Sequence, residues 1–281
     1  MYIPIEIQQI ILEYSEFNIQ LELINLCKEN YDNLKIKILN RTNTTQEILY
    51  QKKYDELQIL YVFNNKKISK VKHLKNTLIS LDCSSECGIE QKEIQELIKL
   101  QKINASGNSK ITDVNHLKNT LIVLFCSHNC GIDQKGIQKL NKLQILNAYD
   151  NSNITDVTHL KNTLIKLDCS HNCGIDQKGI QELTKLQILN ASNNSNITDV
   201  THLKNTLIKL NCSHYCGIVQ KGIQELTKLQ ILNAYDNSKI MDVNHLKNTL
   251  IELYCSSNCE LEQKGINELT KLKILNGKIK S

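Results

Sequence analysis

The sequence predicts an α/β solenoid, in which stacked coils carry short parallel strands on one side and short helices and turns on the other. Its first support is an internal repeat: residues 154–196 recur at 197–239 with six differences, and related blocks occupy 68–110, 111–153 and 240–281. Each block holds two shorter units, in which apolar residues alternate with polar ones as a half-buried strand requires. Because no unit could bury its apolar side alone, neighbouring coils must provide the core.

Leucines mark the start of each unit, in alternating steps of 21 and 22 residues. The units share the pattern L-x-x-L-x-(L/C/A)-x-x-N-x-x-I, which resembles the leucine-rich-repeat family. The resemblance implies strands on the concave face and helices on the convex face. We therefore expect a solenoid of eleven coils over residues 57–281, with unit starts at Leu57, Leu78, Leu100, Leu121, Leu143, Leu164, Leu186, Leu207, Leu229, Leu250 and Leu272.

Polar residues at fixed places in the repeat predict its bends and helix starts. Asp176 is a candidate N-cap for a short helix that turns Ile180 and Leu183 inward. In the alternate unit, residues 198–203 predict a tighter turn. An asparagine recurs at the ninth position, and the resemblance implies that its amide bonds the backbone of the bend, at Asn65, Asn108, Asn151, Asn194 and Asn237.

Cysteines recur as Cys-x-x-x-Cys in five blocks, and in three blocks a histidine lies between them. Zinc binding is one interpretation, and filling of the small inward sixth position is the other. Equivalent cysteines of different blocks lie two coils apart, roughly 10 Å from the strand spacing, so they can share neither a zinc ion nor a disulfide. We favour core packing for Cys126, Cys169 and Cys212, and expect no metal and no cofactor.

Residues 1–33 do not fit the repeat and predict a small helical segment with a proline in its first turn. The segment resembles an F-box at Pro4, Glu6, Ile7, Ile11 and Leu12, then at Leu26, Cys27, Lys28, Tyr31 and Leu34. It departs from that family in being shorter, in Ile3 replacing the first leucine, and in Tyr31 replacing the commoner tryptophan. The resemblance implies that Pro4, Ile7, Ile11 and Leu12 bind a Skp-type adaptor. The alternative is a helical cap that shields the first coil.

Residues 34–56 are expected to form a capping connector, with a strand from Leu34, Ile36 and Ile38 and a helix at residues 45–49. An F-box followed by such repeats resembles the substrate-recruiting F-box/leucine-rich-repeat proteins. The heavy use of Ile, Asn and Lys is similar to that of such proteins in giant DNA viruses of amoebae.

Charge and composition indicate where in the cell the protein is expected to act. The net charge is +5, but residues 1–33 hold six acids against one lysine, a net of −5, so the remainder carries +10. The start lacks a basic secretory signal, no stretch is apolar enough to span a membrane, and eleven cysteines without a signal favour reduced thiols. We expect a cytoplasmic protein, or one of the host cytoplasm or nucleus if it is viral, with no membrane partner.

The six differences between blocks 154–196 and 197–239 all fall on outward strand positions or on the loop that leaves the strand. Exposed aromatics among charges on such a face are typical of protein recognition, whereas drift on an unconstrained surface is the alternative. We expect a protein partner to contact the concave face through Phe125, His128, Lys166, Asp168, His171, Lys209, Asn211, His214, Tyr235 and Tyr254.

These patterns favour a non-enzymatic protein–protein interaction module, since no phosphate loop, catalytic triad or paired acid–base carboxylates are recognisable. With the F-box resemblance, the expected role is the substrate-recognition subunit of a cullin-type ubiquitin ligase. A plain leucine-rich-repeat binding protein with a helical cap is the alternative. A nucleic-acid binder acting through its lysine rows is a remote one, because no aromatic residues interleave with those rows.

Overall fold

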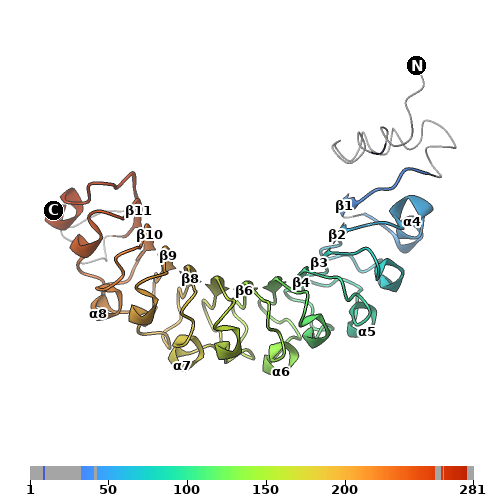
Figure 1. Ribbon diagram of the computed structural model, residues 1–281, viewed down its shortest axis with the longest axis horizontal. Coiled ribbons are helices and arrows are strands. Elements are labelled where there is room, and N and C mark those ends of the chain that lie inside the picture. The colour runs from blue at the N-terminus through green and yellow to red at the C-terminus, as the bar shows by residue number, and fades with distance from the viewer. Residues whose placement is uncertain (1–8, 10–32, 41–42, 257–260, 262, 277–281) are drawn as a thin grey trace, which may run out of the picture.

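The computed structural model describes residues 9, 33–40, 43–256, 261 and 263–276. Within them, twelve short strands form one parallel sheet and lie side by side in chain order. Figure 1 shows the coils stacked in an arc, with the strands along its inner side. The strands are β1 (Ile38–Asn40), β2 (Ile59–Tyr61), β3 (Ser80–Asp82), β4 (Lys102–Asn104), β5 (Val123–Phe125), β6 (Ile145–Asn147), β7 (Lys166–Asp168), β8 (Ile188–Asn190), β9 (Lys209–Asn211), β10 (Ile231–Asn233), β11 (Glu252–Tyr254) and β12 (Ile274–Asn276).

Strand positions follow the leucine spacing closely. Each strand from β2 to β12 begins two residues after a predicted unit start, as Lys166 follows Leu164. Strand β1 lies ahead of these eleven and pairs Ile38 with Ile59 in the same parallel register. It begins later than the expected strand, because Leu34 and Ile36 lie buried in the chain before it. The predicted parallel solenoid is confirmed.

Short helices alternate along the convex side with turns of 3-10 helix (Figure 1). The α-helices are α4 (Gln46–Leu49), α5 (Gln91–Ile94), α6 (Gln134–Ile137), α7 (Gln177–Ile180), α8 (Gln220–Ile223) and α9 (Gln263–Asn267). The 3-10 turns are η1 (Lys52–Tyr54), η2 (Lys72–Leu74), η3 (Asn115–Leu117), η4 (Thr158–Leu160), η5 (Thr201–Leu203) and η6 (Asn244–Leu246). The predicted cap is confirmed, because Asp176 Oδ1 accepts a hydrogen bond from Gly179 N at 3.0 Å.

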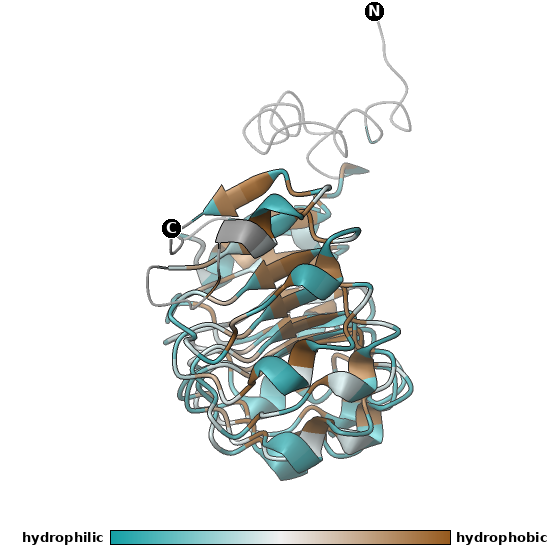
Figure 2. Ribbon diagram, turned by 90° about the vertical axis from the view of Figure 1, so that its left-hand side faces the viewer, coloured by the Kyte–Doolittle hydropathy of each residue, from teal (hydrophilic) through white to brown (hydrophobic). Residues whose placement is uncertain are grey.

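The core runs the length of the arc between the strands and the convex elements. Figure 2 shows apolar residues in the stacked strands and mostly polar residues in the turns around them. Cys126, Cys169 and Cys212 are fully buried, which confirms their inward placement. Burial raises the pKa of the Cys126 and Cys169 thiols well above the usual range, so these two thiols stay protonated. The second cysteine of the pair is buried as well, as at Cys173.

A ladder of buried asparagines holds the bends between coils, as the resemblance implied. Asn194 Nδ2 donates to Cys169 O at 2.8 Å and to Ile175 O at 3.0 Å, while its Oδ1 accepts from Asn196 N. The same contacts recur at Asn108, Asn151 and Asn237. These amides satisfy backbone carbonyls that have no strand partner in the dry interior.

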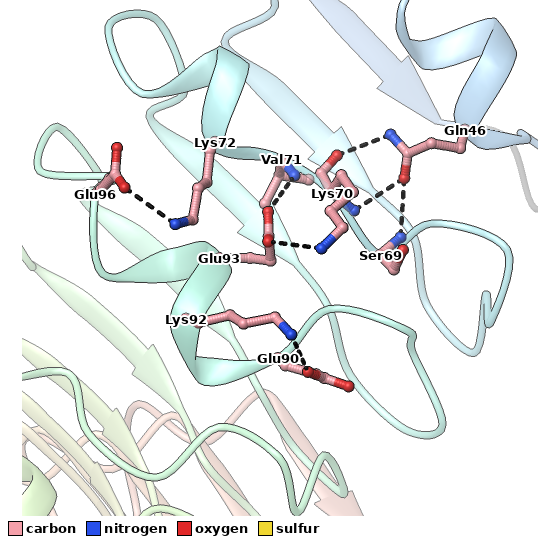
Figure 3. A network of polar contacts seen from close by, with 9 residues as sticks. All are labelled: Gln46, Ser69, Lys70, Val71, Lys72, Glu90, Lys92, Glu93 and Glu96. Carbon is pink, nitrogen blue, oxygen red and sulfur yellow. Dashed lines mark hydrogen bonds and ion pairs between the residues drawn. The ribbon is translucent and has the colours of Figure 1, made fainter.

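A second ladder joins the convex side of neighbouring coils. Gln46 Oε1 accepts from Ser69 N and Lys70 N, and its Nε2 donates to Lys70 O (Figure 3). The first residue of the later helices repeats this three-bond clamp, at Gln91, Gln134, Gln177 and Gln220. The convex side is therefore uniform because its exposed glutamines hold the backbone of the next coil.

The coil of β3 departs from this convex pattern at Glu93 in α5, which stands where α6, α7 and α8 carry a glycine. Its buried carboxylate accepts from Val71 N at 3.1 Å and from Lys70 Nζ at 3.3 Å (Figure 3). In the later coil, Gly136 O accepts from Val114 N instead. The Glu93 side chain thus replaces a backbone contact between coils.

Candidate functional site

Two columns of outward side chains line the concave sheet, one from the first and one from the third residue of each strand. From β6 to β12 the first column alternates isoleucines with charged residues, and Lys166 and Lys209 are exposed in it. The third residues include Phe125, Asp168, Asn211 and Tyr254, all of them half-buried. The structure therefore places these six sequence-predicted residues on one surface.

The second column is mostly part of the framework. Asp168 Oδ1 accepts from Ser170 N at 3.1 Å, and Asn211 Oδ1 accepts from Ser213 N at 3.1 Å. Asp168 Oδ2 also accepts from Asn190 Nδ2 on the next strand. The exchange of Asp168 for Asn211 between blocks therefore preserves the bond that closes the loop, and it needs no partner to explain it.

Aromatic residues interrupt this column at Tyr61, Phe125 and Tyr254. Phe125 has no oxygen for the loop, and Ser127 N donates instead to Ser106 Oγ at 3.2 Å. Lys102 Nζ lies 5.6 Å from the Phe125 ring centroid. The Tyr254 hydroxyl donates to Glu252 Oε2 at 2.9 Å, so that its ring lies along the concave surface.

The three predicted histidines lie beyond the strands, at a point where the backbone turns left-handed. Their φ angles are 58° at His128, 60° at His171 and 57° at His214. The equivalent residues of the alternate coils, Asp150, Asn193 and Asp236 among them, are also left-handed. Asn, Asp, His and Gly adopt this conformation most readily, and Ser85 adopts it at the position equivalent to His128. The backbone therefore favours a small set of residue types in this row.

These loops also bring aromatic rings together. Tyr149 lies between His128 and His171, with ring centroids 4.8 and 4.6 Å apart. Tyr235 lies 5.7 Å from His214 in the same way. Nδ1 of His128 faces Asp150 Oδ2 at 3.5 Å, and Nδ1 of His214 faces Asp236 Oδ2 at 3.6 Å. The row of rings adjoins the concave columns, and the contacts of Tyr149 are not visible in the repeat alone.

A hollow of about 440 Å³, lined by residues 66, 85–88 and 107–110, lies on the same loops and was missed by the sequence analysis. It opens where Gly107 occupies the left-handed position at φ 67° and brings no side chain. In the next coil, His128 fills the equivalent place. The single glycine at the left-handed position of the repeat, Gly107, was the sequence signal that could have predicted this hollow.

The predicted adaptor-binding residues Pro4, Ile7, Ile11 and Leu12 lie outside the described residues, as does the predicted helical segment apart from Gln9 and Asn33. Gln9 bonds the backbone of Lys35, donating to its carbonyl at 3.0 Å and accepting from its N–H at 2.9 Å. Among the described residues, no cluster of three or more His, Cys, Asp or Glu is arranged to hold a metal ion. Over the same residues, no helix has the length and apolar character needed to cross a membrane.

No family model and no curated protein matches the chain. Among solved structures it is similar to the internalin InlF of Listeria monocytogenes, with 21% identity, a TM-score of 0.61, and coverage of 99% of this chain and 89% of that one. It is also similar to the functional domain of InlJ from the same organism, which includes a cysteine ladder, with 23% identity, a TM-score of 0.59 and coverage of 91% and 61%.

A third similar structure is the complex of Rad7 and Elc1 in yeast, with 16% identity, a TM-score of 0.54 and coverage of 96% of this chain and 81% of that one. At these identities the likeness concerns the fold alone. Together with the parallel sheet in chain order and the leucine spacing, it shows that this chain has the leucine-rich-repeat solenoid fold.

Proposed function

We propose that this chain is a protein-binding module whose partner lies against the concave strands and the loops that leave them. The observation that carries the proposal is the presence of rings at Phe125 and Tyr254, two of the three aromatic residues of the second column. Other strands carry an Asn or Asp at this position, and its side-chain oxygen accepts a hydrogen bond from the backbone of the loop. Phe125 and Tyr254 place an aromatic ring there instead. Sites where a repeat departs from its own local rule are where function is expected.

The chemistry of the first column also fits a protein partner. Half-buried isoleucines alternate with lysines over β6 to β10, at Ile145, Lys166, Ile188, Lys209 and Ile231. Such a surface offers apolar contact together with positive charge to a folded or extended protein segment. Aromatic residues are the side chains that most often dominate binding energy at protein interfaces. The proposed contact set remains Phe125, His128, Lys166, Asp168, His171, Lys209, Asn211, His214, Tyr235 and Tyr254.

The test replaces each aromatic by the residue that neighbouring strands carry there. Phe125→Asn and Tyr254→Asn place an amide where Asn147 already accepts from the loop backbone, so the fold should be retained. With a partner captured from lysate and then purified, each variant should bind about ten-fold more weakly or worse, while melting stays unchanged.

The matched controls are Lys161→Ala and Lys204→Ala on the convex side, whose exposed ion pairs with Glu182 and Glu225 contribute little to stability. They should leave binding intact. If the lysine variants abolish binding, the aromatic variants do not, and affinity falls steeply with salt, the surface binds nucleic acid instead.

We further propose that residues 1–33 dock on a Skp-type adaptor of a cullin ubiquitin ligase, so that the solenoid selects a protein for ubiquitination. The support is the F-box-like sequence with Pro4, Ile7, Ile11 and Leu12. Rad7, whose structure is similar, was solved in complex with a second protein, Elc1.

A purified Skp-type adaptor should bind the full chain, and Ile7→Asp with Ile11→Asp should abolish that binding while solenoid melting is unchanged. If these changes instead destabilise the coils and no adaptor binds the unaltered chain, the segment is a cap.

A further inference from the structure

Three exposed apolar residues lie on the loops that lead from β9 and β10 to the convex side, outside the concave columns. We call this side of the solenoid the loop flank. Tyr215 is 86% exposed, Met241 54% and Val219 38%. Val219 and Met241 lie on adjoining coils, because Gln220 N donates to Lys239 O and Gln220 Oε1 accepts from Met241 N. Tyr215 precedes Val219 by four residues in the same loop. Tyr235 lies beside them, since its carbonyl accepts from His214 N. We call Tyr215, Val219 and Met241 the flank patch.

The earlier copies of the repeat carry polar residues at each of these positions. Tyr215 corresponds to Glu86, Asn129 and Asn172, and Val219 corresponds to Glu90, Asp133 and Asp176. Met241 corresponds to Ser69, Thr112, Thr155 and Thr198. The same backbone therefore accepts polar side chains at all three places, and the framework does not demand the apolar ones.

At Val219 the change also removes a stabilising contact. Asp133 and Asp176 each accept a hydrogen bond from the third residue of the helix that they precede, whereas Val219 makes no side-chain cap for α8. An uncapped helix start with an apolar side chain in water is unfavourable on both counts. Scattered exposed apolar residues are ordinary, but here three lie together where the repeat offers polar ones.

The charges around the patch indicate which partner fits. Relative to block 154–196, block 197–239 loses the carboxylates of Asp168 and Asp176, gains that of Asp236, and gains the amine of Lys239, a change of +2. The backbone of Lys239 bonds Gln220 N, and the exposed Lys221 follows Gln220 in the chain, while the exposed Asp242 follows Met241. A complementary segment would bring apolar side chains flanked by carboxylates.

We propose that the flank patch is an anchoring site for an apolar, acidic segment of a partner protein. The inference deepens the proposed function and rests on it in taking the partner to be a protein. It moves the anchor from the concave strands to the loop flank beyond β9 and β10, where the aromatic side chain of Tyr215 is the main contact.

The chain supplies its own matched variant. Tyr215→Asn, Val219→Asp and Met241→Thr together restore the residues found at Asn172, Asp176 and Thr198, so the triple variant should fold and should regain a cap on α8. The probe is a random-peptide display library selected on the full chain. Enriched peptides should be apolar with Asp or Glu, and a synthetic one should bind the triple variant about ten-fold more weakly or worse.

Rebuilding the patch at the equivalent residues of the earlier block tests whether binding follows the patch, independently of its effect on stability. Adding Asn172→Tyr, Asp176→Val and Thr198→Met to the triple variant should restore peptide binding two coils away. Equal affinity of the peptides for the full chain and the triple variant, or enrichment of peptides without this composition, would overturn the proposal. If those peptides and the protein partner are lost with Phe125→Asn and Tyr254→Asn but not with the triple variant, the concave site stands and the flank patch fails.

Discussion

On the convex side, five glutamines at the starts of successive helices make the same three hydrogen bonds to the next coil. On the loop flank, equivalent positions differ between coils: one carries Asn or Tyr, a second carries Asp or Val, and a third carries Ser or Tyr. Both sides face water. The difference is that the convex side chains hold backbone, as Gln177 holds Thr198 and Asp199. An exposed position that carries the same residue in every coil therefore indicates a side chain that holds the backbone. Variation at an exposed position indicates only that no such contact is required there.

This comparison changes how the six differences between the two blocks are weighed. Asp168/Asn211 keeps a loop bond, and Asn193/Asp236 keeps a left-handed backbone. By contrast, Asp176/Val219 abandons a framework contact. A departure such as Asp176/Val219 carries functional weight, because the repeat loses stability there without any gain in packing.

The framework contrast can be tested most strongly at two asparagines of adjacent coils. Asn194 is buried and bonds two carbonyls and one N–H, so Asn194→Ala should lower the free energy of unfolding by about 3 kcal/mol. Asn172 is exposed on the preceding coil, so Asn172→Ala should stay within about 0.5 kcal/mol of the unaltered chain. Urea unfolding followed by circular dichroism gives both values, and equal effects would contradict the ladder.

The repeat spacing predicted the strands because one inward leucine per coil fixes the register of every coil. It also predicted the inward thiols at Cys126 and Cys169, since a small residue is needed where Ala191 lies in the alternate coil. It did not predict the burial of Cys173, which follows from the left-handed turn at His171 two residues earlier. The glutamine clamps were missed for a related reason: they join residues of different coils, and no spacing within one unit reveals them.

A smaller effect is expected from four convex histidines whose rings are half-buried. Burial lowers the pKa of His116, His159, His202 and His245 below the usual 6.5, against the opposing effects of nearby carbonyls and of Asp113, Asp156, Asp199 and Asp242. Nε2 of His116 lies 2.9 Å from Ile94 O, whereas Nε2 of His159, His202 and His245 is buried without a hydrogen bond. The folded state therefore favours the neutral rings.

Because the folded pKa lies below the unfolded one, the contribution of these rings is complete above the unfolded pKa and is lost as the pH falls from there through the folded pKa. Urea midpoints should therefore decrease between about pH 7.5 and pH 5.5. His159→Asn with His202→Asn should reduce that decrease. The control, His171→Asn with His214→Asn, alters loop positions where asparagine suits the left-handed backbone and should leave the decrease unchanged. An equal decrease in all three proteins would show that other groups cause it.

The smallest expected effect concerns the two helix starts that differ between the blocks. Val219→Asp should raise the free energy of unfolding by about 1 kcal/mol, and Asp176→Val should lower it by about 1 kcal/mol, because each adds or removes one N-cap bond. The two positions lie two coils apart, so the double exchange should be neutral to within about 0.5 kcal/mol.

Since solenoids unfold in parts, amide exchange at Gly179 and Gly222 should locate each change: Gly222 N gains protection in Val219→Asp, and Gly179 N loses it in Asp176→Val. If Val219→Asp destabilises the chain instead, the valine is held by packing within its own coil. A gain in stability means that the unaltered chain keeps an unfavourable residue at the surface, and a protein surface keeps such a residue where a partner covers it.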